Sequence, residues 1–255
     1  MVDLHSHILP GLDDGAASLA ESMAIAQSSV RDGVELIAAT PHVREDYPTT
    51  PEEMERCVRQ VRAALEERGI ALELRPGGEV ALDRLPQLEP QELRAFGLAG
   101  NPAYLLVEFP YHGWPLDLHE RAFRLQAAGT TLVLAHPERN DEVQADPSRL
   151  EPVVRAGALV QLTAASVDGR LGRRARAASA ALLERDLAHL VASDAHGPLV
   201  REAGLAEAAR AVGSDRLGRW LCSDVPRAIV EGTPIPPRPA AGGERRPWWA
   251  RLRRG

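Results

Sequence analysis

The chain has 255 residues, enough for one large α/β domain or two small ones, and its 44% hydrophobic and 26% charged residues are ordinary for a globular protein. Its formal net charge of −6 argues against nucleic acid as the principal ligand. The sequence starts without a basic and apolar leader and contains no apolar run of about 18 residues. We therefore expect no secretion signal, no membrane span and a cytoplasmic location.

Short apolar runs rich in leucine and β-branched residues alternate along the chain with longer amphipathic or alanine-rich stretches. This alternation is typical of strand–helix units repeated around a parallel sheet. Strands are predicted at residues 2–7, 34–42, 70–80, 103–110, 130–137, 158–166 and 187–196. Helices are predicted at residues 18–33, 51–69, 119–129, 148–157, 172–186 and 201–213. Glycines end several of the helical stretches, as helix stop signals do, at Gly33, Gly69, Gly129 and Gly157.

The strand–helix unit recurs about every 28 to 37 residues and gives seven predicted strands, as a closed barrel needs. We predict an α/β fold, a distorted (β/α)7-type TIM-like barrel, in a single domain over residues 1–232. A doubly wound open sheet has the same local alternation and remains the alternative. Residues 233–255 are rich in Pro, Gly and Arg, which predicts a poorly ordered tail. In it, Trp248 and Trp249 are candidates for contact with an acidic membrane or a partner.

Ionisable residues stand at the ends of the predicted strands. His5 and His7 end the first strand on the same face, because alternate residues of a strand share a face. The carboxyl ends of parallel strands meet at one rim, which is where active sites form in barrels and open sheets. Any one of these residues alone would be an ordinary loop residue, but their coincidence predicts a metal site. The candidates are His5, His7, His42, Glu79, Glu108, His136, Asp194 and His196, together with Asp13 and Asp14 in the turn after the first strand.

Imidazole and carboxylate groups in this mixture suit Mn, Zn or Fe, and about ten ligands are too many for one ion. They suffice for two or three ions with a bridging carboxylate, an arrangement that clamps the attacking and leaving oxygens in phosphoester hydrolysis. Arg139 lies three residues after His136, and Arg201 lies five after His196. Since a guanidinium holds two phosphate oxygens at once, both arginines favour a phosphoryl substrate.

The two cysteines are too few for a disulfide framework and form no Cys-x-x-Cys pair. Cysteine-dependent tyrosine phosphatases require an arginine six positions after the nucleophile. Here Ala63 follows Cys57 and Ala228 follows Cys222 at that distance, which excludes this class.

The motifs DLHSHILPGLDDGA, ATPHV, GGEV, VEFP, AHPERN and SDAHG occur in the order and spacing of the polymerase and histidinol phosphatase (PHP) superfamily. Over residues 1–232 the sequence specifically resembles its bacterial protein-tyrosine phosphatases of the CpsB/CapC capsule-biosynthesis kind. The resemblance implies a distorted barrel of βα units that holds three divalent ions, usually Mn²⁺, with Zn²⁺, Fe or Co²⁺ as alternatives.

Carried over residue by residue, the resemblance implies three ligand sets. The first ion would bind His5, His7, Glu79 and Asp194. The second would bind Glu108 and His136, with Glu79 as the bridge. The third would bind His42, His196 and Asp14, while Asp13 is the alternative ligand or braces the turn or a neighbouring histidine.

The resemblance implies a metal-dependent protein-tyrosine phosphatase in which Arg139 and Arg201 bind the phosphate and a metal-activated hydroxide attacks in line. The expected substrate is the tyrosine-rich tail of a membrane-associated tyrosine kinase that controls capsular or exopolysaccharide synthesis, which would bring the protein near the membrane. One alternative is a phosphatase for a small metabolite such as histidinol phosphate. The other is a regulatory protein that binds the kinase without catalysis. The sequence makes no prediction of the oligomeric state.

Overall fold

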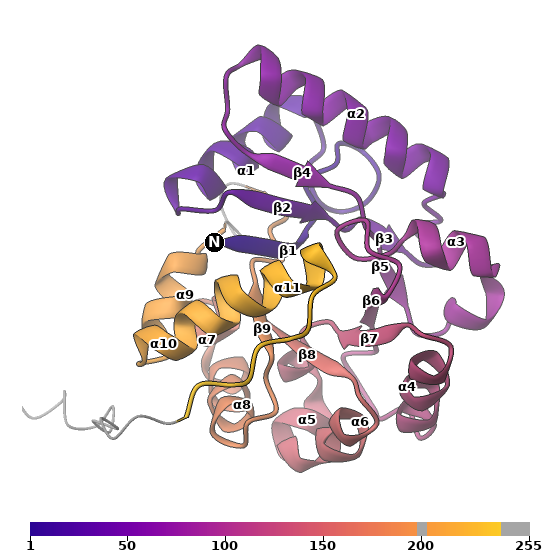
Figure 1. Ribbon diagram of the computed structural model, residues 1–255, viewed down its shortest axis with the longest axis vertical. Helices are drawn as coiled ribbons and strands as arrows, with labels where there is room; N and C mark the ends of the chain where they lie inside the picture. The colour runs from indigo at the N-terminus through magenta and orange to yellow at the C-terminus, as the bar shows by residue number, and fades with distance from the viewer. Residues whose placement is uncertain (198–202, 241–255) are drawn as a thin grey trace, which may run out of the picture.

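Parallel strands form the inside of the molecule, and helices cover them from the outside (Figure 1). The computed structural model describes residues 1–197 and 203–240. In this part of the chain the strands are β1 (Val2–Ser6), β2 (Leu36–Ala39), β3 (His42–Val43), β4 (Glu73–Arg75), β5 (Glu79–Ala81), β6 (Tyr104–Glu108), β7 (Thr131–Leu134), β8 (Leu159–Thr163) and β9 (Leu190–Ala192).

The strands pair in parallel into two groups that join at a seam. One group has the order β1-β2-β4 and the other the order β3-β5-β6-β7-β8-β9. At the seam, the Asp194 amide donates to the His5 carbonyl at 2.8 Å, and the His7 amide donates to the Ala195 carbonyl at 2.9 Å. The sheet thus returns from β9 to β1, and the fold is a distorted α/β barrel, as predicted, rather than a doubly wound open sheet.

Two of the seven predicted strands are interrupted. The strand expected at residues 34–42 is divided into β2 and β3 at Pro41, and the strand expected at 70–80 is divided into β4 and β5 at Pro76 and the two following glycines. Proline has no amide hydrogen and cannot continue a ladder of hydrogen bonds. After the breaks, β3 and β5 pair with His42 directly opposite Glu79. The interruptions therefore place two candidate ligands side by side.

Within the described residues, a helix lies at each of the six predicted places, and five further helices were not predicted. Ser18 caps the first, and Thr50 with Glu53 forms a capping box at the second. The helix expected at residues 201–213 begins, within the described residues, at Leu205, and the strand expected at 158–166 ends at Thr163 because a helix follows at once. The helices are α1 (Leu19–Arg31), α2 (Pro51–Glu67), α3 (Pro90–Ala95), α4 (Leu118–Ala127), α5 (Asp141–Ala145), α6 (Glu151–Arg155), α7 (Ala164–Asp168), α8 (Arg173–Glu184), α9 (Leu205–Ala211), α10 (Asp215–Arg219) and α11 (Val225–Glu231).

The apolar core lies between the strands and these helices. Leu4, Ile37, Leu106 and Val133 on four different strands are fully buried. A strand that is covered on both faces reads as a continuous apolar run, which explains why the strands stand out in the sequence. Among the described residues, no helix is long and apolar enough to cross a bilayer.

The segment after α11 runs back along the barrel instead of leaving it. The Trp220 indole donates to the Pro236 carbonyl at 2.9 Å. The Arg238 guanidinium donates to the carbonyls of Ala188 at 2.7 Å and Leu183 at 3.0 Å. Ile235 also packs against the core. The sequence predicts a poorly ordered tail from residue 233, but residues 235–238 make these contacts with the barrel. Trp248 and Trp249 lie outside the described residues.

Arg238 anchors this segment to the barrel, and its replacement tests how much the anchor contributes to stability. We expect Arg238→Ala to lower the free energy of unfolding by about 2 kcal/mol, because two carbonyls lose a charged donor. The measurement is urea unfolding at a fixed metal concentration. Arg216→Ala, at an exposed position of α10, is the matched control and should leave the midpoint unchanged. Equal midpoints for both variants would contradict a role of Arg238 as an anchor.

Candidate metal centre

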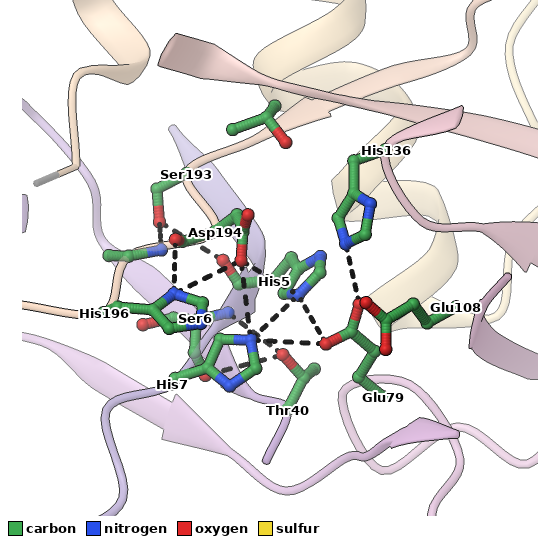
Figure 2. Close-up of polar contacts among 12 residues, drawn as sticks. His5, Ser6, His7, Thr40, Glu79, Glu108, His136, Ser193, Asp194 and His196 are labelled. Atoms are coloured by element: carbon green, nitrogen blue, oxygen red, sulfur yellow. Dashed lines mark hydrogen bonds and ion pairs between the residues drawn. The ribbon is translucent and has the colours of Figure 1, made fainter. Parts of the chain in front are cut away.

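The predicted ligands converge at the carboxyl ends of the strands. His5 and His7 come from β1 and the residue after it, His42 begins β3, and Glu79 begins β5. Figure 2 shows the side chains of His5, His7 and Glu79 pointing toward one another and toward those of Glu108, His136, Asp194 and His196. Except for Arg201, which lies outside the described residues, each predicted site residue is found here. The others are Glu108 at the end of β6, His136 after β7, and Asp194 and His196 after β9.

The Glu79 carboxylate lies at the middle of the cluster and is fully buried. Its Oε2 is 3.3 Å from Nε2 of His5, 3.3 Å from Nε2 of His7 and 3.0 Å from Nδ1 of His42. Its Oε1 is 2.9 Å from Nε2 of His136 (Figure 2). One carboxylate thus faces four imidazoles from the ends of three strands, the geometry expected of a bridging ligand.

Asp194 occupies the next position around the cluster. Its Oδ1 is 3.5 Å from Nε2 of His5, 3.5 Å from Nε2 of His7 and 3.4 Å from Nδ1 of His196. Its Oδ2 accepts a hydrogen bond from Nη1 of Arg139 at 2.8 Å. The carboxylate therefore connects the imidazoles of His5 and His7 with the partly exposed guanidinium of Arg139.

The two carboxylates in the acidic turn after β1, Asp13 and Asp14, make different contacts. Asp14 is partly exposed, and its Oδ1 is 3.4 Å from Nε2 of His42 and 3.3 Å from Nε2 of His196. Asp13 is turned inward: its Oδ2 accepts from Nδ1 of His7 at 2.7 Å and from the amide of His42 at 2.9 Å. Asp14 therefore faces imidazole nitrogens from two other segments, whereas Asp13 braces the histidines from behind.

A glycine completes this turn because no side chain fits there. A Cβ at Gly15 would lie 2.2 Å from the carbonyl oxygen and 2.3 Å from the Cβ of His7. The motif Asp13-Asp14-Gly15 thus needs its glycine for close contact with a candidate ligand. Two non-glycine residues of the site, His136 at φ 35° and Asp194 at φ 53°, have left-handed backbone conformations, which cost free energy and cluster at functional sites.

The donor atoms fit divalent ions. Among the described residues there are four overlapping groups in which the nitrogen and oxygen atoms of each group lie within 4.8 Å of one another. These groups are His5, His7 and Asp194; His5, Glu79 and His136; His42, Glu79 and Glu108; and His7, Asp14, His42 and His196. Within the described residues, buried Oε2 of Glu79 and Nδ1 of His42 make no hydrogen bond of good geometry, although they lie 3.0 Å apart. Nitrogen and oxygen lone pairs that face a common point suit Mn, Zn or Fe.

The opposite charges in the cluster stabilise one another despite burial. Burial alone would raise the pKa of Glu79, but His5 and His42 hold it well below its usual value. Burial alone would lower the pKa of His42, but Glu79 and Asp14 raise it to about 9. For His7, burial is likewise outweighed, here by Asp13, and its pKa is well above the usual value. Without a cation the imidazoles of His7 and His42 therefore favour their protonated forms at neutral pH, and a divalent ion must replace those protons.

The structure adds residues that the sequence analysis missed. Arg44 lies 3.5 Å from Oε2 of Glu108 and is held by Asp46. The Tyr111 ring stacks on His136, and the Arg139 guanidinium lies 4.7 Å above that ring. Arg44 and Tyr111 are loop residues with no spacing that marks them in the sequence.

Comparisons with known proteins agree with this geometry. Residues 1–226 match the family described as capsular polysaccharide synthesis, CpsB/CapC. The tyrosine-protein phosphatase YwqE of Bacillus subtilis (strain 168) is 36% identical over 202 residues, which make up 79% of each chain. The tyrosine-protein phosphatase CpsB of Streptococcus pneumoniae is 33% identical over 204 residues, 77% of this chain and 83% of CpsB.

A solved structure supports the same conclusion. It comes from crystal structures of YwqE and CpsB, which are described as unique metal-dependent tyrosine phosphatases. The match covers 94% of this chain and 99% of the chain in the solved structure. The TM-score is 0.84 at 33% identity. With a sequence match over most of its length and the same fold, this chain belongs to the CpsB/CapC family.

Proposed function

We propose that this chain is a metal-dependent protein-tyrosine phosphatase. The observation that carries the proposal is the buried Glu79 carboxylate facing four imidazoles, with the Arg139 guanidinium at the neighbouring Asp194. Its relatives YwqE and CpsB are tyrosine-protein phosphatases, and the family is tied to capsular polysaccharide synthesis. A phosphoester substrate fits a centre of several cations beside a guanidinium.

The proposed cofactors are three divalent ions, with Mn²⁺ as the preferred metal. His5, His7, Asp194 and Glu79 would hold the first ion. Glu108 and His136 would hold the second, with Glu79 as the bridge, and His42, His196 and Asp14 the third. The four atom groups of the cluster support three neighbouring sites but overlap, since His7 also faces the third and His42 the second.

Bound divalent cations supply Lewis acidity, which neutralises phosphoryl oxygens and activates a water for in-line attack. The chain supplies orientation and exclusion of water. Arg139 is held between Asp194 and the Tyr111 ring, so its planar fork is positioned before the phosphate arrives. Arg201 stays a prediction as the second phosphate-binding arginine.

The thiols take no part in this chemistry. Cys57 and Cys222 are both buried. Burial raises the pKa of Cys57 and raises that of Cys222 to about 12, so neither provides a thiolate nucleophile at neutral pH. The proposed reaction therefore proceeds without a cysteinyl-phosphate intermediate.

The proposed physiological substrate is the phosphotyrosine-containing tail of a membrane-associated tyrosine kinase that controls capsule or exopolysaccharide synthesis. Family membership supports a phosphotyrosine substrate in that process. A catalytic domain over residues 1–232, and a cytoplasmic location close to the membrane-bound kinase, stay predictions from the sequence.

Removal of the metals tests the proposal directly. We expect a chelator to abolish hydrolysis of a phosphotyrosine peptide and added Mn²⁺ to restore it, while Cys57→Ser and Cys222→Ser keep wild-type rates. Phosphate release on the peptide and on histidinol phosphate separates the two substrate classes. Turnover that resists the chelator would refute the metal mechanism, and a preference for histidinol phosphate would refute the peptide substrate.

Replacement of Arg139 tests phosphate binding. We expect Arg139→Ala to lower kcat/KM for the phosphotyrosine peptide by about 100-fold, because a donor that meets the developing charge is lost. Arg139→Lys should recover part of this, since an ammonium keeps the charge but not the fork. Arg149→Ala, at an exposed arginine that pairs with Glu142, is the control. A wild-type kcat/KM in Arg139→Ala with full metal content would exclude this role.

Replacement of Asp14 tests the third ion. We expect elemental analysis to find three ions per chain in the wild type and two in Asp14→Ala, because His42 and His196 would lose the carboxylate that faces both. Asp83→Ala, at an exposed aspartate after β5, should keep all three. Three ions in Asp14→Ala would show that this carboxylate is not a ligand.

A further inference from the structure

Gln161 is a polar side chain in the middle of the buried strand β8. It is fully buried, between the equally buried Val160 and Leu162. The proposed function assigns no role to any residue of β8. Since burying an amide costs free energy unless its hydrogen bonds are made, a glutamine at this position needs an explanation.

One atom of Gln161 contacts two proposed ligands. Its Oε1 lies 3.0 Å from Nδ1 of His5 and accepts from the backbone amide of His136 at 3.3 Å. A backbone amide only donates, so the Gln161 atom that faces it must be the oxygen. An amide oxygen only accepts, so Nδ1 of His5 must carry a hydrogen. A neutral imidazole with its hydrogen on Nδ1 has its lone pair on Nε2, the atom that points at Glu79.

The other end of the amide makes no hydrogen bond. Within the described residues, the buried Nε2 of Gln161 has no partner. A buried donor without a partner destabilises the fold, and an apolar side chain of similar size would avoid this cost. Gln161 therefore provides an oxygen atom to two proposed ligands, although its unpaired nitrogen lowers stability. A role in positioning these ligands explains the glutamine better than a role in stabilising the fold.

Asp13 makes the same pair of contacts with two other histidines. Its Oδ2 accepts from Nδ1 of His7 and from the amide of His42, as described above. His5 and His7 are thus each tied, through one oxygen atom, to the backbone amide of a histidine from another segment. The two oxygens differ in charge, because Asp13 offers a carboxylate and Gln161 a neutral amide.

We propose that Gln161 is a positioning residue of the metal centre. It fixes the imidazole of His5 with its proton on Nδ1 and its Nε2 toward the metals, and it sets the position of His136 through the backbone. This inference rests on the proposed function, since it takes His5 and His136 as metal ligands. Partners of this kind orient the ring and set the basicity of a ligating histidine.

Two variants separate the oxygen from the bulk of the side chain. We expect Gln161→Leu to weaken Mn²⁺ binding to the chelator-treated protein by about 10–100-fold, measured by titration calorimetry. In its metal-free form the unpaired nitrogen is gone, but Nδ1 of His5 and the His136 amide lose their acceptor, so thermal unfolding serves only to confirm that the variant is folded. Gln161→Glu should bind Mn²⁺ more nearly like the wild type, since one carboxylate oxygen accepts both hydrogen bonds.

Gln126→Leu is the matched control, because Oε1 of Gln126 accepts from Thr131 at the other end of β7, away from the centre. It should bind Mn²⁺ with wild-type affinity. Wild-type affinity in Gln161→Leu, or an equal loss in Gln161→Leu and Gln161→Glu, would overturn the proposal.

A measurement on the wild type covers the case in which Gln161→Leu does not fold. In the Zn²⁺-loaded protein with ¹⁵N-labelled histidine, NMR should find the proton of His5 on Nδ1 and the metal on Nε2. The reverse assignment would overturn the inference. Metal binding that depends on Gln161 in a protein without phosphatase activity would instead refute the proposed function and leave this inference intact.

Discussion

The structure depends on the concentration of lone pairs around Glu79 in the interior. Carboxylates and imidazoles are held there away from water, at distances of 2.9–3.5 Å from one another. In a medium of low dielectric constant, such groups cost free energy unless protons or cations lie between them. The folded chain therefore has one buried place where positive charge is strongly stabilising. Packing of the barrel must offset the free energy that it costs to hold these carboxylates and imidazoles together.

The barrel meets this demand by taking the groups from different strands. Most of the ligands stand in or shortly after strands that are paired in parallel, and the packed apolar core leaves these strands little freedom. The left-handed conformations at His136 and Asp194 persist for the same reason, since the surrounding structure determines them. Rigidity of this kind keeps several like ligands together before any ion arrives.

Much of the fold could be predicted because strands that are buried on both faces read as plain apolar runs. The rim position of the ligands followed from the same pattern, since a histidine or acid at the end of such a run has a fixed place in a parallel sheet. The breaks in the second and third predicted strands could not be foreseen, because proline and glycine, which stand at these breaks as Pro41 and Gly78, also occur in ordinary turns at the end of a strand. Short helices such as α5 are too short to show a period.

Gln161 gave one signal, a polar residue inside an apolar run, but its partners come from strands far away in sequence. The anchor at Arg238 escaped because composition describes a segment and says nothing about one guanidinium that finds two carbonyls.

The seam between β1 and β9 has a consequence for the order in which the protein matures. His5 lies in the first strand and His7 follows it, while Asp194 and His196 come almost two hundred residues later. There, Asp194 and Ala195 pair with the backbone of His5 and His7. A ribosome that has made the chain as far as α8 has therefore made most of the imidazoles, but neither β9 nor the Asp194 carboxylate that follows it. The centre comes into existence only when the two ends of the barrel meet, so metal acquisition belongs to the finished chain and not to the growing one.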